Sequence, residues 1–173
     1  CQLPIAAMGS FSLAYRRDVD RFIADAAAAG IDGLILPDLP LEEYATVGAA
    51  AEKRGLVHIM LVAPTTPWDR ARRIAEQSTG FVYYISVTGI TGERAALPPE
   101  LADRVAKLRS VTQAPICVGF GISRPEQVRQ VTDVADGAIV GSAIVRRVHE
   151  LSAGPREKLA AGLGQYVAEL AAA

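Results

Sequence analysis

Short runs that are apolar at every position, separated by amphipathic stretches, constrain the fold of this chain more than any other feature. Residues 34–36, 59–62 and 138–140 are such runs. Strands that are apolar on both faces belong in parallel sheets covered by helices. The pattern therefore predicts six strands, at 3–9, 33–37, 57–63, 81–86, 115–120 and 137–141.

The stretches between these runs have apolar residues at helical spacing. Val19, Ile23 and Ala26 form one stripe along a predicted helix. Further stripes lie within residues 44–47, 71–75, 101–108 and 159–170. The Ser-Arg-Pro-Glu segment at 123–126 is typical of a capping box, which marks another helix start. Strands and helices that alternate in this way predict right-handed crossovers, and either an open doubly wound sheet or a (β/α)8 barrel.

The length of the chain bears on the choice between these two folds. A complete barrel has eight strand–helix units and about 250 residues, whereas this chain has 173 residues and six predicted strands. We expect residues 1–173 to be a single barrel domain that lacks its first two units. An intact open sheet of six strands remains possible. Six units of a barrel would leave two strand edges uncovered, so we expect this chain to aggregate or to be inactive when alone.

Composition excludes several classes of function. The chain has 18 Lys and Arg against 19 Asp and Glu, so it lacks the basic excess that binds nucleic acid or an anionic membrane surface. Both cysteines are isolated, Cys1 at the start of the sequence and Cys117 in an apolar run, so they imply no disulfide framework, which fits a reducing, cytoplasmic compartment. His58 and His149 have no partner at metal-ligand spacing, so we expect no metal site.

Glycine-containing turns follow the last three predicted strands, at residues 88–92, 119–123 and 141–142. Glycine at the carboxyl end of a strand lets backbone N–H groups approach an anion, and the helix predicted to start at Ser142 adds its positive dipole end. The last two strand ends of a (β/α)8 barrel are a common phosphate site. The turns therefore predict a phosphate-binding barrel, although they complete neither a dinucleotide fingerprint nor a P-loop.

Four segments extend this pattern to a particular family. Residues 37–43 (Pro-Asp-Leu-Pro-Leu-Glu-Glu), Tyr83 with 86–92, residues 119–128 and residues 136–145 resemble the successive signatures of the tryptophan synthase α chain. They occur in the family's order and spacing. The resemblance covers the whole chain, from what would be the third barrel strand to the last helix.

The resemblance implies a lyase of tryptophan biosynthesis. Indole-3-glycerol phosphate would undergo a retro-aldol cleavage to indole and glyceraldehyde 3-phosphate. An α chain of this family works with a β chain in an α2β2 complex and passes indole to it. The resemblance implies no cofactor in this chain, because pyridoxal phosphate is expected only in the partner β chain.

The resemblance also implies roles for individual residues. Backbone groups that would hold the phosphate belong to Gly92, Gly121, Gly141 and Ser142. Side chains that would line the indole side belong to Met8, Tyr83 and Phe120. Thr91 matches the threonine that orients a catalytic aspartate, and Asp38 matches an acidic residue at the contact with the β chain. Tyr83 and Tyr84 alternate across a strand, and we expect Tyr83 to point into the barrel.

The chemistry needs a general acid and a general base, and neither is expected in this chain. The family supplies a Glu at the end of its second strand and an Asp in the following loop, a region that precedes residue 1. Asp38 and Glu93 are the only acids near predicted strand ends, and neither matches. The chain also departs from the family at residues 9–12, where Gly-Ser-Phe-Ser stands in place of a Tyr and an Asn.

Two other functions remain open from the sequence. Another phosphate-binding barrel, such as a sugar-phosphate isomerase or epimerase, would share the last two glycine turns. It would not be expected to share residues 37–40 together with residues 89–92. A non-catalytic interaction module is the second alternative, and the missing carboxylates are its only support.

Overall fold

The computed structural model describes residues 2–86, 98–119 and 121–173, and within them it contains one six-stranded parallel sheet. The strands are β1 (Ala6–Met8), β2 (Gly33–Ile35), β3 (Val57–Val62), β4 (Val82–Ile85), β5 (Ile116–Gly119) and β6 (Gly137–Ile139). Each lies within a predicted run, so all six predicted strands are confirmed. Their order in the sheet is the order in the sequence, and every neighbouring pair is parallel.

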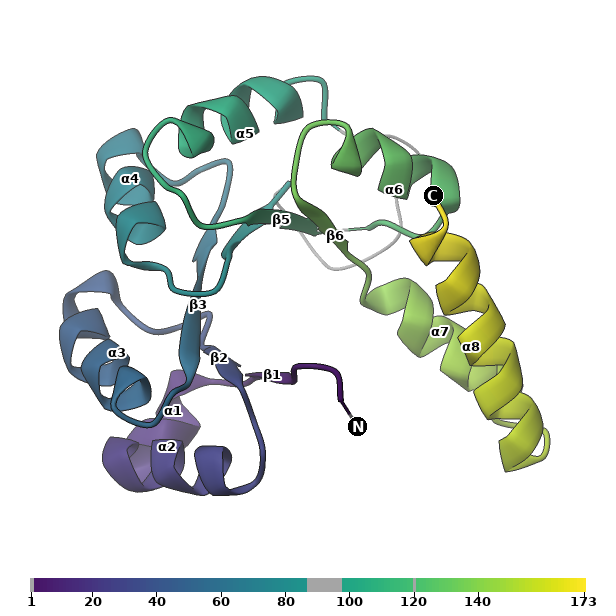
Figure 1. The fold of residues 1–173 in the computed structure, drawn as a ribbon, viewed down its shortest axis with the longest axis horizontal. Helices are drawn as coiled ribbons and strands as arrows, with labels where there is room; N and C mark the ends of the chain where they lie inside the picture. The colour runs from purple at the N-terminus through teal and green to yellow at the C-terminus, as the bar shows by residue number, and fades with distance from the viewer. Residues whose placement is uncertain (1, 87–97, 120) are drawn as a thin grey trace.

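The sheet is curved and the helices lie around its outside (Figure 1). A doubly wound sheet reverses its strand order part of the way along and has helices on both faces. Neither feature is present in the described residues. The fold is therefore an incomplete (β/α)8 barrel, and the open-sheet alternative is wrong. In Figure 1 the arc is open between β1 and the last two helices.

The helices follow the strands in regular alternation. They are α1 (Phe11–Arg16), α2 (Val19–Ala28), the 3-10 turn η1 (Leu41–Glu43), α3 (Tyr44–Glu52), α4 (Trp68–Gln77), α5 (Leu101–Arg109), α6 (Pro125–Thr132), α7 (Ser142–Leu151) and α8 (Arg156–Ala171). The short helix α1 was not predicted. The capping box predicted at 123–126 is wrong by one residue, because the Gln127 side chain, not that of Glu126, accepts the N–H groups of Ser123 and Arg124 at 3.0 and 3.1 Å.

The core lies between the sheet and the helices, in two clusters. Ile23, Leu34 and Val47 are at the centre of the first, which joins α2 and α3 to β2. Val105 and Val118 are at the centre of the second and larger cluster, which joins α4, α5, α6 and α8 to β3, β4 and β5. Full burial of such a side chain contributes about 1.5–3 kcal/mol. The helices thus cover the outward face of the sheet, and the opposite, concave face remains available for a binding site.

Aspartates tie neighbouring strands together at their amino ends. The Asp32 carboxylate, just before β2, accepts the backbone N–H of Ile5 at 2.8 Å. The Asp136 carboxylate, just before β6, accepts the backbone N–H of Ile116 in the same way, also at 2.8 Å. Arg109 donates to Asp136 as well, at 2.8 Å. These bonds satisfy strand-end N–H groups and help to fix which residues face each other across the sheet.

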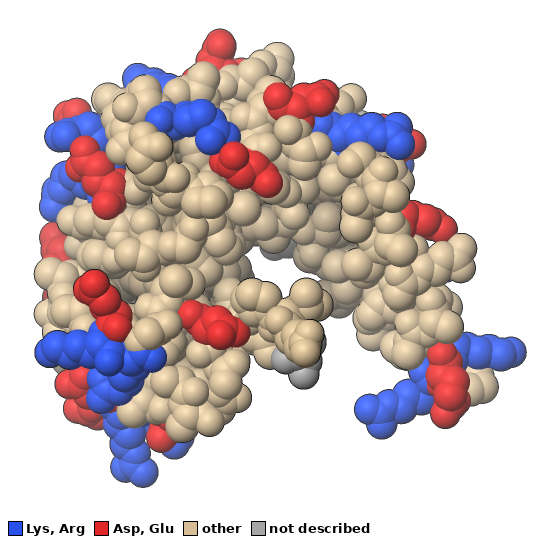
Figure 2. Space-filling view, in the orientation of Figure 1, with Lys and Arg blue, Asp and Glu red and all other residues tan. Residues whose placement is uncertain are grey.

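Apolar side chains are exposed at both ends of the arc. Leu3, Ile5 and Met8 are 74, 45 and 57% exposed at the β1 end. Val145 on α7 and Val167 on α8 are 69 and 43% exposed at the other end. A largely apolar hollow of about 450 Å³ lies there between β6, α6, α7 and α8. In Figure 2 the arc is open between the two ends, so this surface is uncovered.

Residues 1–173 on their own are expected to self-associate, because strand edges and apolar surface at both ends of the arc are free to pair. Replacing Val167 by Lys should reduce this association by adding a charge to one end. Ala161→Lys is the matched control, since it adds the same charge to an exposed position of the same helix and removes no large apolar side chain. Size-exclusion chromatography with light scattering measures the effect, and a monodisperse monomer for the unmodified chain would contradict the prediction.

Candidate functional site

The concave face of the sheet is lined by one side chain from each neighbouring strand. Leu61, Tyr83 and Cys117 lie side by side in one row, because β3, β4 and β5 pair in this register. Tyr84 is 2% exposed within the sheet–helix core, so Tyr83 occupies the opposite, concave face. The predicted inward direction of Tyr83 is confirmed. Its phenol lies beside Gly119, where an added Cβ would be 2.7 Å from the hydroxyl oxygen.

Burial keeps the titratable groups of this row uncharged. It raises the pKa of the Tyr83 phenol above its usual value of 10.0. Burial, and to a lesser extent the Asp136 carboxylate, raises the pKa of the Cys117 thiol above its usual value of 9.0. At neutral pH the concave face therefore offers Tyr83 as a neutral hydroxyl and Cys117 as a thiol, not as a nucleophilic thiolate.

Two backbone turns suited to an anion meet at the carboxyl ends of β5 and β6. Gly119 of β5 pairs with Ile139 of β6, and each is followed two residues later by a turn glycine, Gly121 or Gly141. Gly121 has φ 79°, a conformation that favours glycine. Helix α7 starts at Ser142 without a side-chain cap, so its first N–H groups are not satisfied by a capping side chain. Thr91, Gly92 and Phe120 lie outside the described residues.

Asp38 joins the ends of β1 and β2. Its carboxylate accepts the Ser10 hydroxyl at 2.5 Å and the backbone N–H of Phe11 at 2.6 Å. The Ser10 hydroxyl first, and then the Phe11 N–H, hold the pKa of the exposed Asp38 carboxyl below its usual value of 3.8. Asp38 is thus an anion at neutral pH with internal partners, and not a general acid. Ser10 also caps the start of α1, where serine is a preferred residue type. This preference is the sequence feature that could have drawn attention to Ser10.

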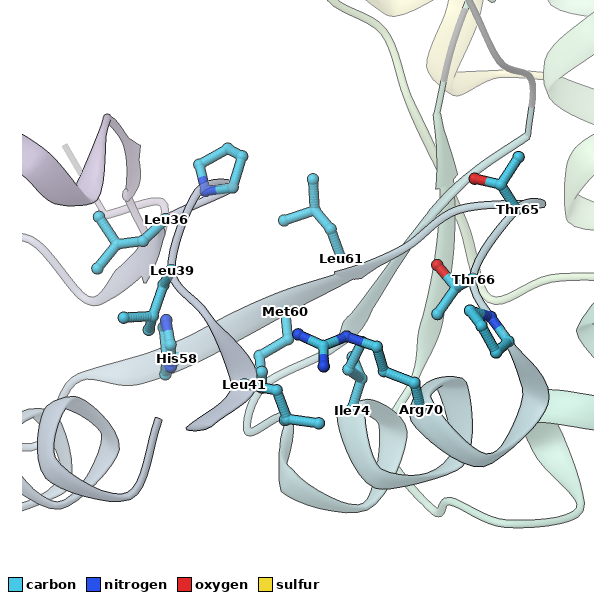
Figure 3. A pocket seen from close by; sticks show the side chains of 12 residues that line it. Leu36, Leu39, Leu41, His58, Met60, Leu61, Thr65, Thr66, Arg70 and Ile74 are labelled. Carbon is cyan, nitrogen blue, oxygen red and sulfur yellow. The ribbon is translucent and has the colours of Figure 1, made fainter. Parts of the chain in front are cut away.

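A cavity of about 330 Å³ lies between β2, β3 and α4 (Figure 3). Figure 3 shows Arg70 reaching from α4 toward Leu41 and Met60. Its guanidinium donates to the Glu42 carboxylate at 2.9 Å, so an ion pair joins α4 to η1. Both side chains are partly exposed, and such a pair contributes little to stability. The residues that line this cavity come from segments far apart in the chain, so local sequence patterns do not predict it.

His58, which lies at one side of this cavity, is held by packing. Its ring stacks on Tyr44 with 5.0 Å between centroids and 10° between planes. The side chain is 2% exposed, and burial lowers the pKa of His58 from 6.5 to about 4. His58 is therefore neutral at pH 7. Among the described residues no three His, Cys, Asp or Glu side chains are grouped as a metal site would require.

The fold and the two anion-suited turns define the class of protein: an incomplete (β/α)8 barrel whose last two strand ends face a common concave site. Comparison with known proteins then gives the family. A model of the family "Tryptophan synthase alpha chain" matches residues 1–173, and the chain belongs to this family.

Individual relatives agree with this assignment. The tryptophan synthase alpha chain of Rhodopirellula baltica is 52% identical over 146 residues, which are 84% of this chain and 52% of the relative. That of Geobacter sulfurreducens is 44% identical over 173 residues, which are 100% of this chain and 63% of the relative. The chain thus spans between about half and two thirds of the length of these relatives.

Solved structures show the same fold. A mutant tryptophan synthase alpha-subunit from Pyrococcus furiosus superimposes with a TM-score of 0.85 at 30% identity, over 100% of this chain and 68% of that one. The tryptophan synthase a2b2 complex of the same organism gives a TM-score of 0.85 at 33% identity, over 98% of this chain and 67% of that one. None of the helices in the described ranges has the length and apolar character needed to cross a membrane.

The stability of the barrel can be tested in what we call the extended chain: residues 1–173 preceded by the N-terminal part of the Geobacter sulfurreducens relative. Two predictions use it.

The first prediction concerns Gly119. In Gly119→Ala the new Cβ would lie 2.7 Å from the Tyr83 hydroxyl and 3.0 Å from the Ile139 Cβ, so the phenol must move. Such overpacking costs roughly 1–3 kcal/mol. Gly164→Ala, in an open position of α8, should instead stabilise by about 0.5–1 kcal/mol. Urea unfolding that ranks the two variants the other way would contradict this.

The second concerns His58 and pH. Above pH 6.5 the folded and unfolded chains both have a neutral His58. As the pH falls from 6.5 to about 4, only the unfolded chain binds the proton, so His58 lowers the free energy of unfolding by roughly 3 kcal/mol in total. His58→Phe keeps a ring against Tyr44 and should remove this pH dependence. His149→Gln, on exposed α7, should retain it. Urea unfolding between pH 7 and 4 tests both, and an unchanged slope in His58→Phe would contradict the assignment.

Proposed function

We propose that this chain forms the larger part of a lyase that cleaves indole-3-glycerol phosphate to indole and glyceraldehyde 3-phosphate in tryptophan biosynthesis. One observation supports this above others. The anion-suited turns at Gly121 and Gly141 lie on neighbouring strand ends, at the same concave face as Tyr83. A phosphate and an aromatic ring in one substrate match this arrangement. Membership of the tryptophan synthase alpha chain family disfavours other phosphate-binding barrels.

In this proposal the phosphate is held by the backbone. The N–H groups at Gly121, Gly141 and Ser142 would donate to its oxygens, and Gly92 would contribute from the preceding loop. The positive end of the α7 dipole stabilises a dianion at the same point. Because no side-chain cap occupies the start of α7, these donors need not be released from another partner before they bind substrate.

The indole ring would occupy the rest of the concave face. Tyr83, Met8 and Phe120 are the proposed contacts. Met8 ends β1 with 57% of its surface exposed, so it is accessible to a ligand. Tyr83 keeps its proton at neutral pH because burial raises its pKa, and it can therefore act as a hydrogen-bond donor or an apolar wall but not as a base.

The proton transfers need groups that the described residues do not supply. Cleavage requires protonation of the indole ring at C3, removal of its N–H proton and deprotonation of a glycerol hydroxyl. The Asp38 carboxylate already accepts hydrogen bonds from the Ser10 hydroxyl and the Phe11 N–H. His58 stacks on Tyr44 in the sheet–helix layer and does not lie on the concave face. Glu93, the other acid near a predicted strand end, lies outside the described residues and does not match the family's catalytic acids. We propose that the catalytic Glu and Asp belong to a segment outside residues 1–173, with Thr91 orienting the Asp.

We propose a tryptophan synthase β chain as the partner, in an α2β2 complex. Leu13 and Tyr15 are 60 and 72% exposed on α1, the helix whose first residue, Phe11, donates its backbone N–H to Asp38. Exposed aromatic and apolar side chains next to a charge are typical of an interface. Pyridoxal phosphate would belong to the β chain alone, with no cofactor in this chain. We propose a cytoplasmic location, which suits the free thiol of Cys117.

Indole release from indole-3-glycerol phosphate tests the function. We expect the extended chain to release indole and residues 1–173 alone to release none. Gly141→Val in the extended chain should raise KM by roughly 10-fold or more, because the valine side chain would occupy the space of the phosphate and keep its oxygens from the backbone N–H groups. An added Cβ at Gly141 meets no atom within 4 Å, so the fold should tolerate the change. Gly164→Ala is the control and should leave KM unchanged.

Each other outcome has a definite meaning. If the extended chain binds glyceraldehyde 3-phosphate but releases no indole, the barrel and its phosphate site are correct and the proposed reaction is wrong. If Gly141→Val leaves KM unchanged in an active extended chain, the phosphate does not lie at the β5 and β6 turns.

A further inference from the structure

The ends of β1 and β2 are joined by hydrogen bonds that continue beyond the last paired residues of the two strands. The β1–β2 ladder ends at Met8 and Ile35, and one more bond follows, from the Gly9 N–H to the Ile35 carbonyl at 3.0 Å. The Asp38 carboxylate then continues the connection: one of its oxygens accepts the Ser10 hydroxyl and the other accepts the Phe11 N–H. These contacts join residues 27 and 28 positions apart in the chain.

The other side of β2 is connected in a different way. The pairing of β2 with β3 stops at Ile35 and Ile59, and the cavity of about 330 Å³ opens between the two strands beyond that point. On this side the segment is connected by the partly exposed ion pair of Arg70 and Glu42, and by the buried Leu41, which belongs to one core cluster with Met60 and Ile74. The segment that follows β2 is therefore held to β3 and α4 by packing and an ion pair, and its hydrogen bonds to the end of β1 are made by Asp38.

This connection to β1 lies directly next to the concave site. Met8, the last residue of β1, is two positions before Ser10, and Pro37 is the residue before Asp38. The Ser10 hydroxyl is already engaged, because it contacts the Ser12 hydroxyl at 2.7 Å as well as Asp38. The Ser10 hydroxyl therefore stabilises this loop and is not free to bind a ligand.

We propose that Asp38 is a positioning residue for the concave site: it holds the ends of β1 and β2 together and so fixes Met8 where substrate enters. The inference rests on the proposed function for its kinetic consequence, but not for the contact itself. It gives Asp38 a role within the chain that does not depend on its charge, beside the proposed partner contact of the same surface.

Asparagine separates these two roles. In Asp38→Asn the amide oxygen can still accept the Phe11 N–H, and the amide N–H can donate to the Ser10 oxygen, while the charge is lost. Asp38→Ala loses both the contacts and the charge. Glu42→Gln is the matched control, because Glu42 lies in the same segment and its carboxylate meets Arg70 instead.

The test measures two quantities in the extended chain: the hydrogen-exchange rate of the Phe11 amide and the kinetics of indole release. Asp38→Ala should speed exchange at Phe11 by roughly fivefold or more, as expected when a helix start loses its acceptor. It should also raise KM several-fold while kcat stays within about twofold, since binding and not chemistry is affected. Asp38→Asn and Glu42→Gln should both stay near the unmodified chain.

The outcomes are distinguishable. If Asp38→Ala changes neither exchange nor KM, the inference is wrong. If Asp38→Asn is as impaired as Asp38→Ala, charge is what matters and the positioning role is wrong. If the unmodified extended chain releases no indole, the proposed function fails, and indole affinity then replaces KM: equal affinity of Asp38→Ala and the unmodified chain would overturn the inference.

Discussion

Parallel pairing of short apolar strands is the constraint on which the rest of this structure depends. Parallel strands cannot be joined by tight turns, so each is followed by a helix that crosses back over the sheet. All six carboxyl ends consequently lie at one edge, and the helices cover one face only. The concave face and the loops at that edge are left free, which is why the proposed site residues that the structure describes come from a strand end or from the concave face.

Charge is distributed in keeping with this arrangement. In Figure 2 the charged side chains lie mainly around the outside, and the surface bordering the central opening is mostly uncharged. The proposed phosphate site accordingly depends on backbone N–H groups at Gly121, Gly141 and Ser142 rather than on Lys or Arg. Backbone donors at a helix start are fixed in direction by the fold itself, so binding requires little reorganisation.

The strands could be predicted because each is a continuous apolar run, and the direction of Tyr83 because side chains alternate strictly along a strand. Helix α1 could not, since six residues are too few to show a helical period. The Gln127 cap was displaced by one residue from the predicted box, which is within the usual uncertainty of helix ends. The stacking of His58 on Tyr44 and the ion pair of Arg70 with Glu42 join parts of the chain that are far apart in sequence. Local sequence patterns therefore could not predict them.

The sequence alone determined the six strands, the opposite directions of Tyr83 and Tyr84 and the resemblance to the family, because strand period, glycine position and motif order are local properties. The curved sheet decided between a barrel and an open sheet, and the burial of Tyr84 in the sheet–helix core put Tyr83 on the concave face. Only the tertiary structure decided what Asp38 does. The sequence placed it near a strand end, and the structure places its carboxylate between Ser10 and Phe11, residues brought near by the pairing of β1 with β2. The physical reason is that a short hydrogen bond depends on distances between strand ends, and these are set only once the sheet has formed and curved.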